Sequence, residues 1–162
     1  MAGSANKKVF VTRFDRETLH GFVRSPDGFE PDGFDLLTPA GEHLRIPYSE
    51  TKVVCFVREF EGGETWQKQR SFSTRPKSSG LWLRLAFRDG ETLEGIAPNN
   101  LLLLESAGFQ IIPPDPTFQN QRIFVPRVAL SDVQVLGVIG SPLKRRKPAL
   151  PPDRGGQLKM FD

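Results

Sequence analysis

The last residues of the chain combine apolar side chains with one amide, at a spacing suited to binding in a peptide cleft. Leu158, Met160 and Phe161 are apolar and lie close together, and Gln157 precedes them. An extended segment can insert the three apolar side chains into a hydrophobic groove, while the carbonyl and amide groups of Gln157 fix its register at the groove edge. The alternative is that these apolar residues fold back onto the body of the protein.

The pattern Gln-Leu-x-Met-Phe at residues 157–161 resembles the peptide by which bacterial DNA-processing proteins dock on the replicative sliding clamp. The resemblance implies that the clamp is a binding partner and that Gln157, Leu158, Met160 and Phe161 make the contact. Lys159 would point outward, and it departs from the small or acidic residue that such peptides often carry there. The resemblance covers five residues and leaves the role of the body open.

Four adjacent cations precede this motif, namely Lys144, Arg145, Arg146 and Lys147. Such a run can lie along a phosphate backbone and give salt-sensitive, sequence-independent attraction to DNA, or it can simply keep a tail solvated. Between the cations and the motif, residues 148–156 are rich in Pro and Gly, which indicates an extended spacer. The tail holds six basic and two acidic residues of a chain whose net charge is +3, so the body is close to neutral.

A second group of basic residues lies in the middle of the chain, interleaved with Trp66 and Phe72. Its cations are Lys68, Arg70, Arg75 and Lys77. Aromatic side chains among cations can stack on nucleic-acid bases. They can also pack at the junction between two folded units, and we favour packing.

The residues available for catalysis are few. His20 and His43 are the only histidines, and neither has the spacing to a nucleophile and a carboxylate that a triad would require. The acidic residues near the predicted turns are expected to be solvated, and these are Asp15, Glu17, Glu91 and Glu94. Cys55 lies in an apolar run and is predicted to be a buried small hydrophobe. The sequence therefore predicts a protein that is not an enzyme and has no metal or cofactor.

The composition suggests a cytoplasmic protein. The first residues lack the apolar stretch of a secretory signal, and no apolar run is long enough to span a membrane. A single cysteine allows no internal disulfide.

The body contains an internal repeat. Glu-Thr-Leu-x-Gly occurs at residues 17–21 and again at 91–95, and each copy is followed at a similar distance by Gly-Phe. Each unit also begins and ends with β-rich runs. Agreement in order, spacing and residue type indicates a duplication.

Each repeat is predicted to form about five short strands. Residues 9–14 alternate in the period of a pleated strand, and Asp89-Gly90 is a tight-turn signal. Gly21 and Gly95 fall inside the second strand of each unit, where Gly is typical of a bend that curls a small sheet. Only one helical turn is expected, within residues 99–107.

This order of strands, turn and bent strand resembles the Sm-like branch of the SH3-type barrels. The pair of units also resembles an uncharacterised bacterial family of tandem repeats, over residues 8–140, with counterparts of segments 56–61 and 113–125. The expected fold is all-β, with two tandem small barrels and a disordered tail. The expected boundaries are a first unit at 7–60, a connector at 61–79, a second unit at 80–140 and the basic tail at 141–162.

The resemblance to Sm-like proteins does not carry over to RNA binding. Sm proteins use a late Arg-Gly pair, whereas the second unit reads Val125-Pro126-Arg127 and the first reads Ile46-Pro47-Tyr48. We therefore expect an adaptor that binds the sliding clamp in DNA replication or repair. The alternatives are an interaction module that acts through its barrels, with oligomerisation through barrel edges, and a nucleic-acid-binding protein that acts through its tail.

Overall fold

The computed structural model describes residues 6–24, 29–61, 69–103, 107–114 and 120–140. The secondary structure of these described residues is strands with three short 3-10 turns, so the all-β prediction is confirmed. No helix in the described part of the chain has the length and hydrophobicity to span a membrane.

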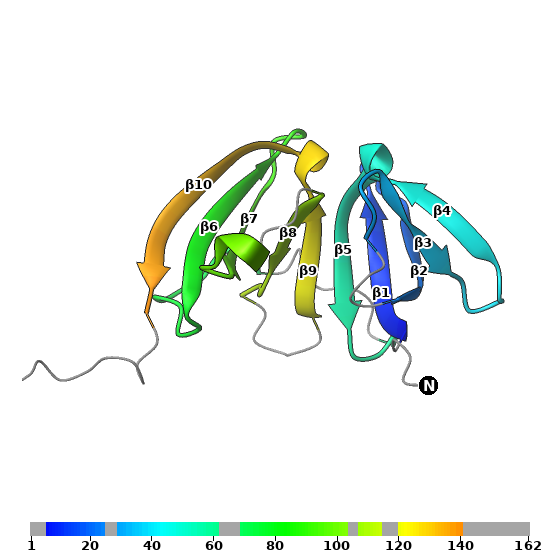
Figure 1. Ribbon diagram of the computed structural model, residues 1–162, viewed down its shortest axis with the longest axis horizontal. Coiled ribbons are helices and arrows are strands. Elements are labelled where there is room, and N and C mark those ends of the chain that lie inside the picture. The colour runs from blue at the N-terminus through cyan, green and yellow to red at the C-terminus, as the bar shows by residue number, and fades with distance from the viewer. Residues whose placement is uncertain (1–5, 25–28, 62–68, 104–106, 115–119, 141–162) are drawn as a thin grey trace, which may run out of the picture.

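Two sets of five strands follow one another along the chain (Figure 1). The first set is β1 Asn6–Arg13, β2 Thr18–Arg24, β3 Gly33–Leu37, β4 His43–Pro47 and β5 Thr51–Val57. The second set is β6 Gly80–Phe87, β7 Thr92–Ala97, β8 Gly108–Ile111, β9 Asn120–Pro126 and β10 Leu130–Ile139. The 3-10 turns are η1 Tyr48–Glu50, η2 Leu101–Leu103 and η3 Arg127–Ala129.

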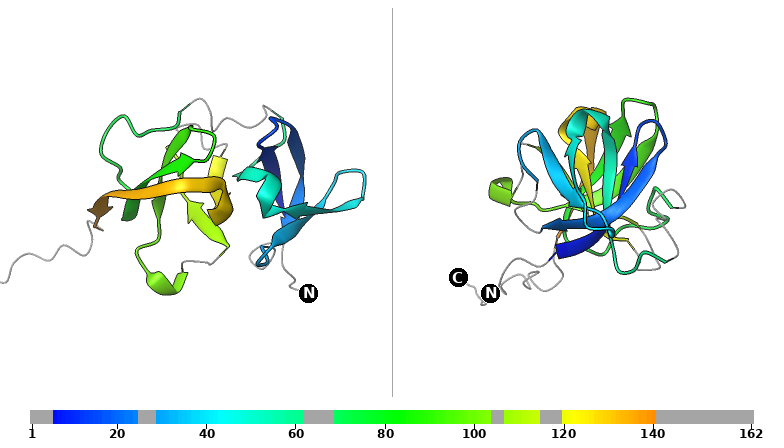
Figure 2. Two further views of the ribbon diagram at one scale, coloured as in Figure 1. Left: turned by 90° about the horizontal axis from the view of Figure 1, so that it is seen from above. Right: turned by 90° about the vertical axis from the view of Figure 1, so that its right-hand side faces the viewer.

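The two sets repeat one strand order. The first unit runs β4-β3-β2-β1-β5. In the second unit β10-β6-β7 form a sheet, and a single bridge between Ile96 and Ile112 leads on to β8 and β9. The units stand side by side, with β4 and β10 at their outer edges (Figures 1 and 2).

The repeat extends to individual hydrogen bonds. In the turn of the first unit the N–H of Arg13 donates to Glu17 O at 2.9 Å, and in the second the N–H of Phe87 donates to Glu91 O at 2.8 Å. Asp15 and Asp89 each accept a bond from the backbone N–H two residues later. The duplicated sequence therefore folds twice into the same local structure.

The repeated glycines of the second strands are required by close packing. A Cβ at Gly21 would lie 2.4 Å from the carbonyl oxygen of Leu37, and one at Gly95 would lie 2.4 Å from Cδ1 of Ile111. The third strand of each unit thus crosses directly over the glycine. The sequence marks Gly21 and Gly95 as positions of a bend, and the structure shows that a side chain there would collide with the third strand.

A pair of strands joins the two units. β5 of the first unit pairs antiparallel with β9 of the second, with Val54 opposite Phe124 and Cys55 opposite Ile123. The pairing merges β1–β5, β8 and β9 into a seven-stranded sheet. We call β5 and β9 together the shared wall, because each face of this pair covers a different core.

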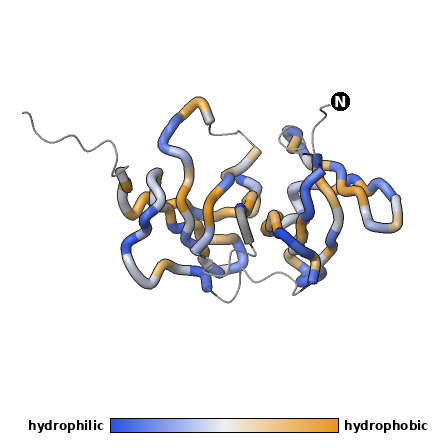
Figure 3. Tube along the Cα trace, turned by 90° about the horizontal axis from the view of Figure 1, so that it is seen from below, coloured by the Kyte–Doolittle hydropathy of each residue, from blue (hydrophilic) through white to orange (hydrophobic). Residues whose placement is uncertain are grey.

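The first core lies on one side of the shared wall and the second on the other. The buried members of the first core are Val9, Val11, Val23, Phe34, Leu36, Ile46, Tyr48, Val54, Phe56 and Phe124. Those of the second are Phe10, Val53, Cys55, Val57, Leu83, Leu85, Phe87, Leu93, Ala97, Ile111, Ile123, Val125 and Ala129. Each core therefore borrows residues from the other unit. Figure 3 shows hydrophobic and hydrophilic residues interspersed along the Cα trace of both units.

Burial on two faces explains the composition of β5. All seven of its residues are buried, because Val54 and Phe56 face the first core while Val53, Cys55 and Val57 face the second. A strand covered on both sides is expected to be a continuous apolar run. Cys55 is fully buried there, which confirms its predicted role as a small hydrophobe.

Phe124 should be critical for stability although it belongs to the second unit. It is fully buried in the first core, with its ring stacked on Phe29 at 4.1 Å between centroids. Phe124→Ala should lower the free energy of unfolding by about 3–5 kcal/mol, measured by chemical denaturation. Val128→Ala is the control, since Val128 is 56% exposed. Equal effects of the two changes would contradict the role of the shared wall.

Candidate functional site

A buried lysine connects the two units beside the shared wall. Lys52 of β5 has a side chain that is 6% exposed, and its ammonium group lies 2.7 Å from Oδ2 of Asp89 and in contact with Glu91. Its Nζ also lies 5.1 Å from the centroid of the Phe87 ring. A buried ammonium requires such compensation, because its desolvation is otherwise costly. The turn of the second unit thus supplies both counter-ions of Lys52.

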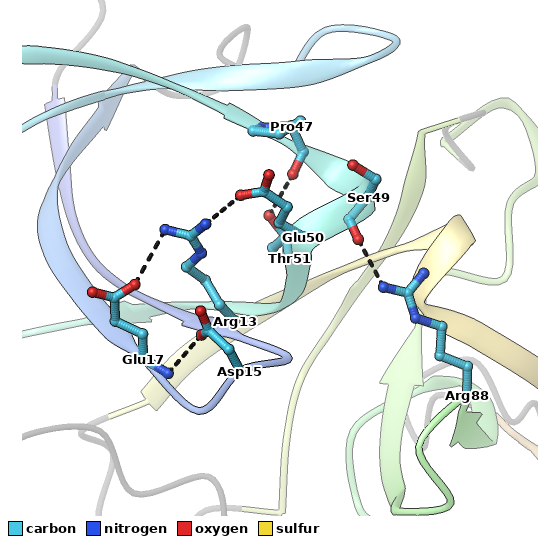
Figure 4. Close-up of polar contacts among 8 residues, drawn as sticks. All are labelled: Arg13, Asp15, Glu17, Pro47, Ser49, Glu50, Thr51 and Arg88. Carbon is cyan, nitrogen blue, oxygen red and sulfur yellow. Dashed lines mark hydrogen bonds and ion pairs between the residues drawn. The ribbon is translucent and has the colours of Figure 1, made fainter.

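A second cation makes the reverse connection, from the second unit to the first. Arg88 donates from Nη2 to the carbonyl oxygen of Ser49 at 2.7 Å (Figure 4). The Arg88 guanidinium also lies 4.1 Å from the centroid of the Phe14 ring. The guanidinium of Arg88 therefore both stacks on an aromatic ring and donates to a backbone carbonyl.

The first turn carries its own charged group near this junction. Arg13 contacts Glu50 and lies 3.3 Å from Glu17, so its guanidinium is held by two carboxylates (Figure 4). Arg16, at the tip, is exposed and has a φ of 74°, where the equivalent Gly90 has 98°. The structure records no ion pair between Arg16 and another described residue.

These groups border a polar cavity of about 340 Å³. Its charged lining consists of Arg13, Arg16, Lys52, Asp89 and Glu91. All except Arg16 are engaged in the ion pairs just described. The charged groups of this site therefore serve mainly to hold the two units together through ion pairs.

The pKa of Asp89 is affected by its contacts in this site. Burial by itself would raise the pKa, but the hydrogen bonds from the Lys52 ammonium and the Glu91 backbone N–H outweigh it, so the pKa lies below its ordinary value of 3.8. Asp89 is thus held as a carboxylate.

Each unit also has a hollow at an equivalent place on its sheet. The hollow of the second unit measures about 410 Å³ and is mostly apolar, with Arg122 at its border. That of the first measures about 230 Å³ and is polar, with His43 in the place of Arg122. The duplicated surface has thus diverged in chemistry.

The sequence-predicted binding residues of the tail lie outside the described residues. These are Gln157, Leu158, Met160 and Phe161 of the terminal motif and Lys144, Arg145, Arg146 and Lys147 of the basic run.

The two histidines lie on different parts of the first unit. His20 belongs to an aromatic cluster, with its ring centroid 4.9 Å from that of Phe60 and 5.8 Å from that of Phe10. His43 begins β4 and borders the hollow of the first unit. Among the described residues no group of three or more His, Cys, Asp or Glu side chains is placed to hold a metal.

The connector packs, as favoured from the sequence, and its described residues Phe72 and Arg70 contact the second unit. The Phe72 ring meets Trp82 of β6 edge-on at 6.2 Å between centroids. Arg70 lies 3.6 Å from Glu91. Trp66 and Lys68 lie outside the described residues.

The expectation that all four acidic residues near the turns are solvated is wrong for Glu94. Its side chain is 12% exposed, and Oε1 accepts hydrogen bonds of 3.1 Å from both the Phe72 N–H and the Trp82 indole. Glu91 is likewise engaged, in its case by Lys52. The aromatic residues nearby were a usable signal, since a buried indole needs an acceptor.

Residues 5–137 match the model of DUF6982, described as a family of unknown function. The matched range ends within β10, so the tail lies beyond it. No curated protein and no solved structure matches the chain.

The lowered pKa of Asp89 predicts an acid-dependent contribution to stability. That contribution is present above the unfolded pKa of 3.8 and is lost as the pH falls through the lower folded value. The wild type should therefore exceed Asp89→Asn in unfolding free energy at neutral pH, and the gap should close below about pH 4. Denaturant titrations from pH 7 to pH 2 measure it. Asp15→Asn is the matched control, because Asp15 makes the same turn contact but no ion pair with another described residue. A similar pH profile for both variants would refute the coupling.

The two equivalent turn positions should respond oppositely to substitution. Arg16→Gly should raise the free energy of unfolding by up to about 1 kcal/mol, because the left-handed conformation strains any residue with a Cβ. Gly90→Ala should lower it by about 1 kcal/mol or more, although a Cβ there meets no atom within 4 Å. Thermal and urea unfolding measure both. A stabilised Gly90→Ala protein would be inconsistent with backbone strain as the cause.

Proposed function

The chain belongs to DUF6982, and we propose that this member is a non-enzymatic adaptor that docks on the bacterial sliding clamp. The contact is made by the terminal peptide, in which Leu158, Met160 and Phe161 fill a hydrophobic cleft and Gln157 fixes the register. The setting is DNA replication or repair in the cytoplasm.

The observation that carries this proposal is the peptide itself, together with its position in the chain. The peptide follows the last strand and lies beyond the range matched by the family model. Sixteen residues separate Gly140 from Gln157, enough to span at most about 50–60 Å. The motif can therefore engage a partner without requiring that partner to contact the body.

The placement of β10 is compatible with such a tether. Its final residues, at Ile139, lie at the end of the second unit farthest from the first unit (Figure 1). The tail thus begins at one extremity of the body. The strand β4 lies at the opposite end of the body.

The basic run would act as an auxiliary contact. Lys144, Arg145, Arg146 and Lys147 precede the spacer, and the clamp that the motif would bind encircles DNA. Their attraction to phosphates is sequence-independent and weakens steeply with salt. Contacts of the apolar anchors depend on salt much less, so the two contributions can be separated.

Fluorescence polarisation with purified clamp tests the proposal. A labelled peptide of residues 151–162 should bind with a Kd on the order of micromolar, since ordering an extended segment costs part of the interaction energy. The full-length protein should compete with it. Leu158→Ala together with Phe161→Ala should weaken binding at least about tenfold, because buried anchors dominate such contacts.

Lys159→Ala is the matched control, because Lys159 is expected to point outward and its replacement should leave the Kd within about threefold. Failure of the wild-type peptide to bind at high micromolar clamp would refute the proposal. Salt-sensitive DNA binding that persists in the double variant would instead favour the nucleic-acid alternative.

A further inference from the structure

The junction between the two units shows how this fold accepts a foreign strand. β9 lies along β5, with Phe124 opposite Val54 and Ile123 opposite Cys55. Phe124 enters the first core, while Ile123 turns to the second. A strand added to the fifth strand of a unit thus contributes one apolar side chain to that unit's core, flanked by side chains that face away.

β10 is the fifth strand of the second unit and has the same relation to its neighbour. Val11 pairs with Val54 in the first unit, and Leu85 pairs with Val133 in the second, so Val133 takes the place of Val54. By the same register Val135 takes the place of Phe56. Phe56 is 8% exposed, whereas Val135 is 58% exposed. Both β9 and the Phe29 ring lie against Phe56 of β5, while within the described residues β10 pairs only with β6.

The free edge of β10 has only part of the usual protection against strand addition. Exposed edges are commonly blocked by Lys, Pro, inward-pointing charges or β-bulges, and in β10 bulge-type register shifts lie only outside residues 132–135. β10 contains one charged residue, Asp132, and neither Lys nor Pro. Register shifts at each end leave a regular stretch at residues 132–135. This stretch is as long as the four-residue pairing of β5 with β9.

The opposite free edge, β4, is blocked. Its central residue, Arg45, takes the place of Phe124, since Asp35 pairs with Arg45 as Gln110 pairs with Phe124. The Arg45 guanidinium lies 2.8 Å from Glu30, 2.7 Å from Asp32 and 3.2 Å from Asp35. A strand with this residue at its centre is unsuited to entering an apolar core.

The β4 edge of a second copy of the chain is therefore a poor partner for β10. Its β4 would bring Arg45 against Val133 and Val135, away from the carboxylates that hold it. Its Leu44 and Ile46 would face the outward side of β10. That side carries Asp132 and Gln134, in the places of Val53 and Cys55. The residues of β4 and β10 thus disfavour a pairing of β4 from one copy with β10 of another in the way that β9 pairs with β5.

We propose that residues 132–135 of β10 accept an extended segment of a different protein, one with an apolar residue at its centre and basic or polar residues beside it. The apolar side chain would lie over Val133 and Val135, as Phe124 lies against β5. A basic side chain beside it would meet the carboxylate of Asp132, which is exposed. The backbone of the segment would complete the ladder along β10.

A peptide derived from β9 tests this inference. The probe is the Asn120–Pro126 sequence carrying Ile123→Thr and Val125→Lys, which keeps Phe124 and places the lysine opposite Asp132. Nuclear magnetic resonance of the full-length protein should show amide shifts concentrated at residues 132–135. Binding should fall at least tenfold for the same peptide carrying Phe124→Asp.

Charge exchange provides a control that does not depend on folding. Asp132→Lys changes an exposed residue and should weaken the lysine peptide at least tenfold, while a peptide with Val125→Glu should regain the affinity. Absence of shifts at millimolar peptide, or shifts centred elsewhere, would overturn the inference. So would concentration-dependent dimerisation abolished by Asp132→Lys, or a large gain in peptide affinity on deleting residues 141–162. None of these readouts involves the clamp, so this proposal and the proposed function fail separately.

Discussion

The pairing of β5 with β9 is the constraint on which the rest of the structure depends. It sets Val54 and Phe56 into one core and Val53, Cys55 and Val57 into the other. A strand pair buried on both faces is expected to be largely apolar, which explains the run at residues 53–57, while the buried Lys52 is compensated by its ion pairs. The ion pairs of Lys52 and the contacts of Arg88 then lock the turns on either side of this wall.

The two units keep the same backbone and differ in the residues that decide which surface is buried. Arg13 and Phe14 stand where the second unit has Phe87 and Arg88, so each turn has one cation and one aromatic ring in opposite order. That exchange allows Arg88 to stack on Phe14. The two units thus share one fold but differ at their edges: β5 and β9 pair with each other, whereas β4 and β10 lie at the outer edges.

The internal repeat and the strands of each unit could be predicted from the sequence because they depend on local spacing. Examples are the Asp89-Gly90 turn and the glycines of the second strands. The merging of units through β5 and β9 could not be predicted, since strand partners distant in the chain leave no local signal. The continuous apolar run Val53–Val57 was the one trace of it. Glu94 was misjudged although Trp82, one of its two hydrogen-bond donors, lies in the same hairpin and was a usable signal; Phe72 comes from the connector.

The borrowed residue Phe124 also has a consequence for synthesis on the ribosome. A nascent chain that has emerged as far as residue 61 possesses all five strands of the first unit, yet its core still lacks this ring. Domains ordinarily fold in order of emergence, at rates limited by translation. The first unit is therefore expected to reach its full stability only after β9 has emerged. Its folding is thus coupled to that of the second unit, although the two repeats are separate in the sequence.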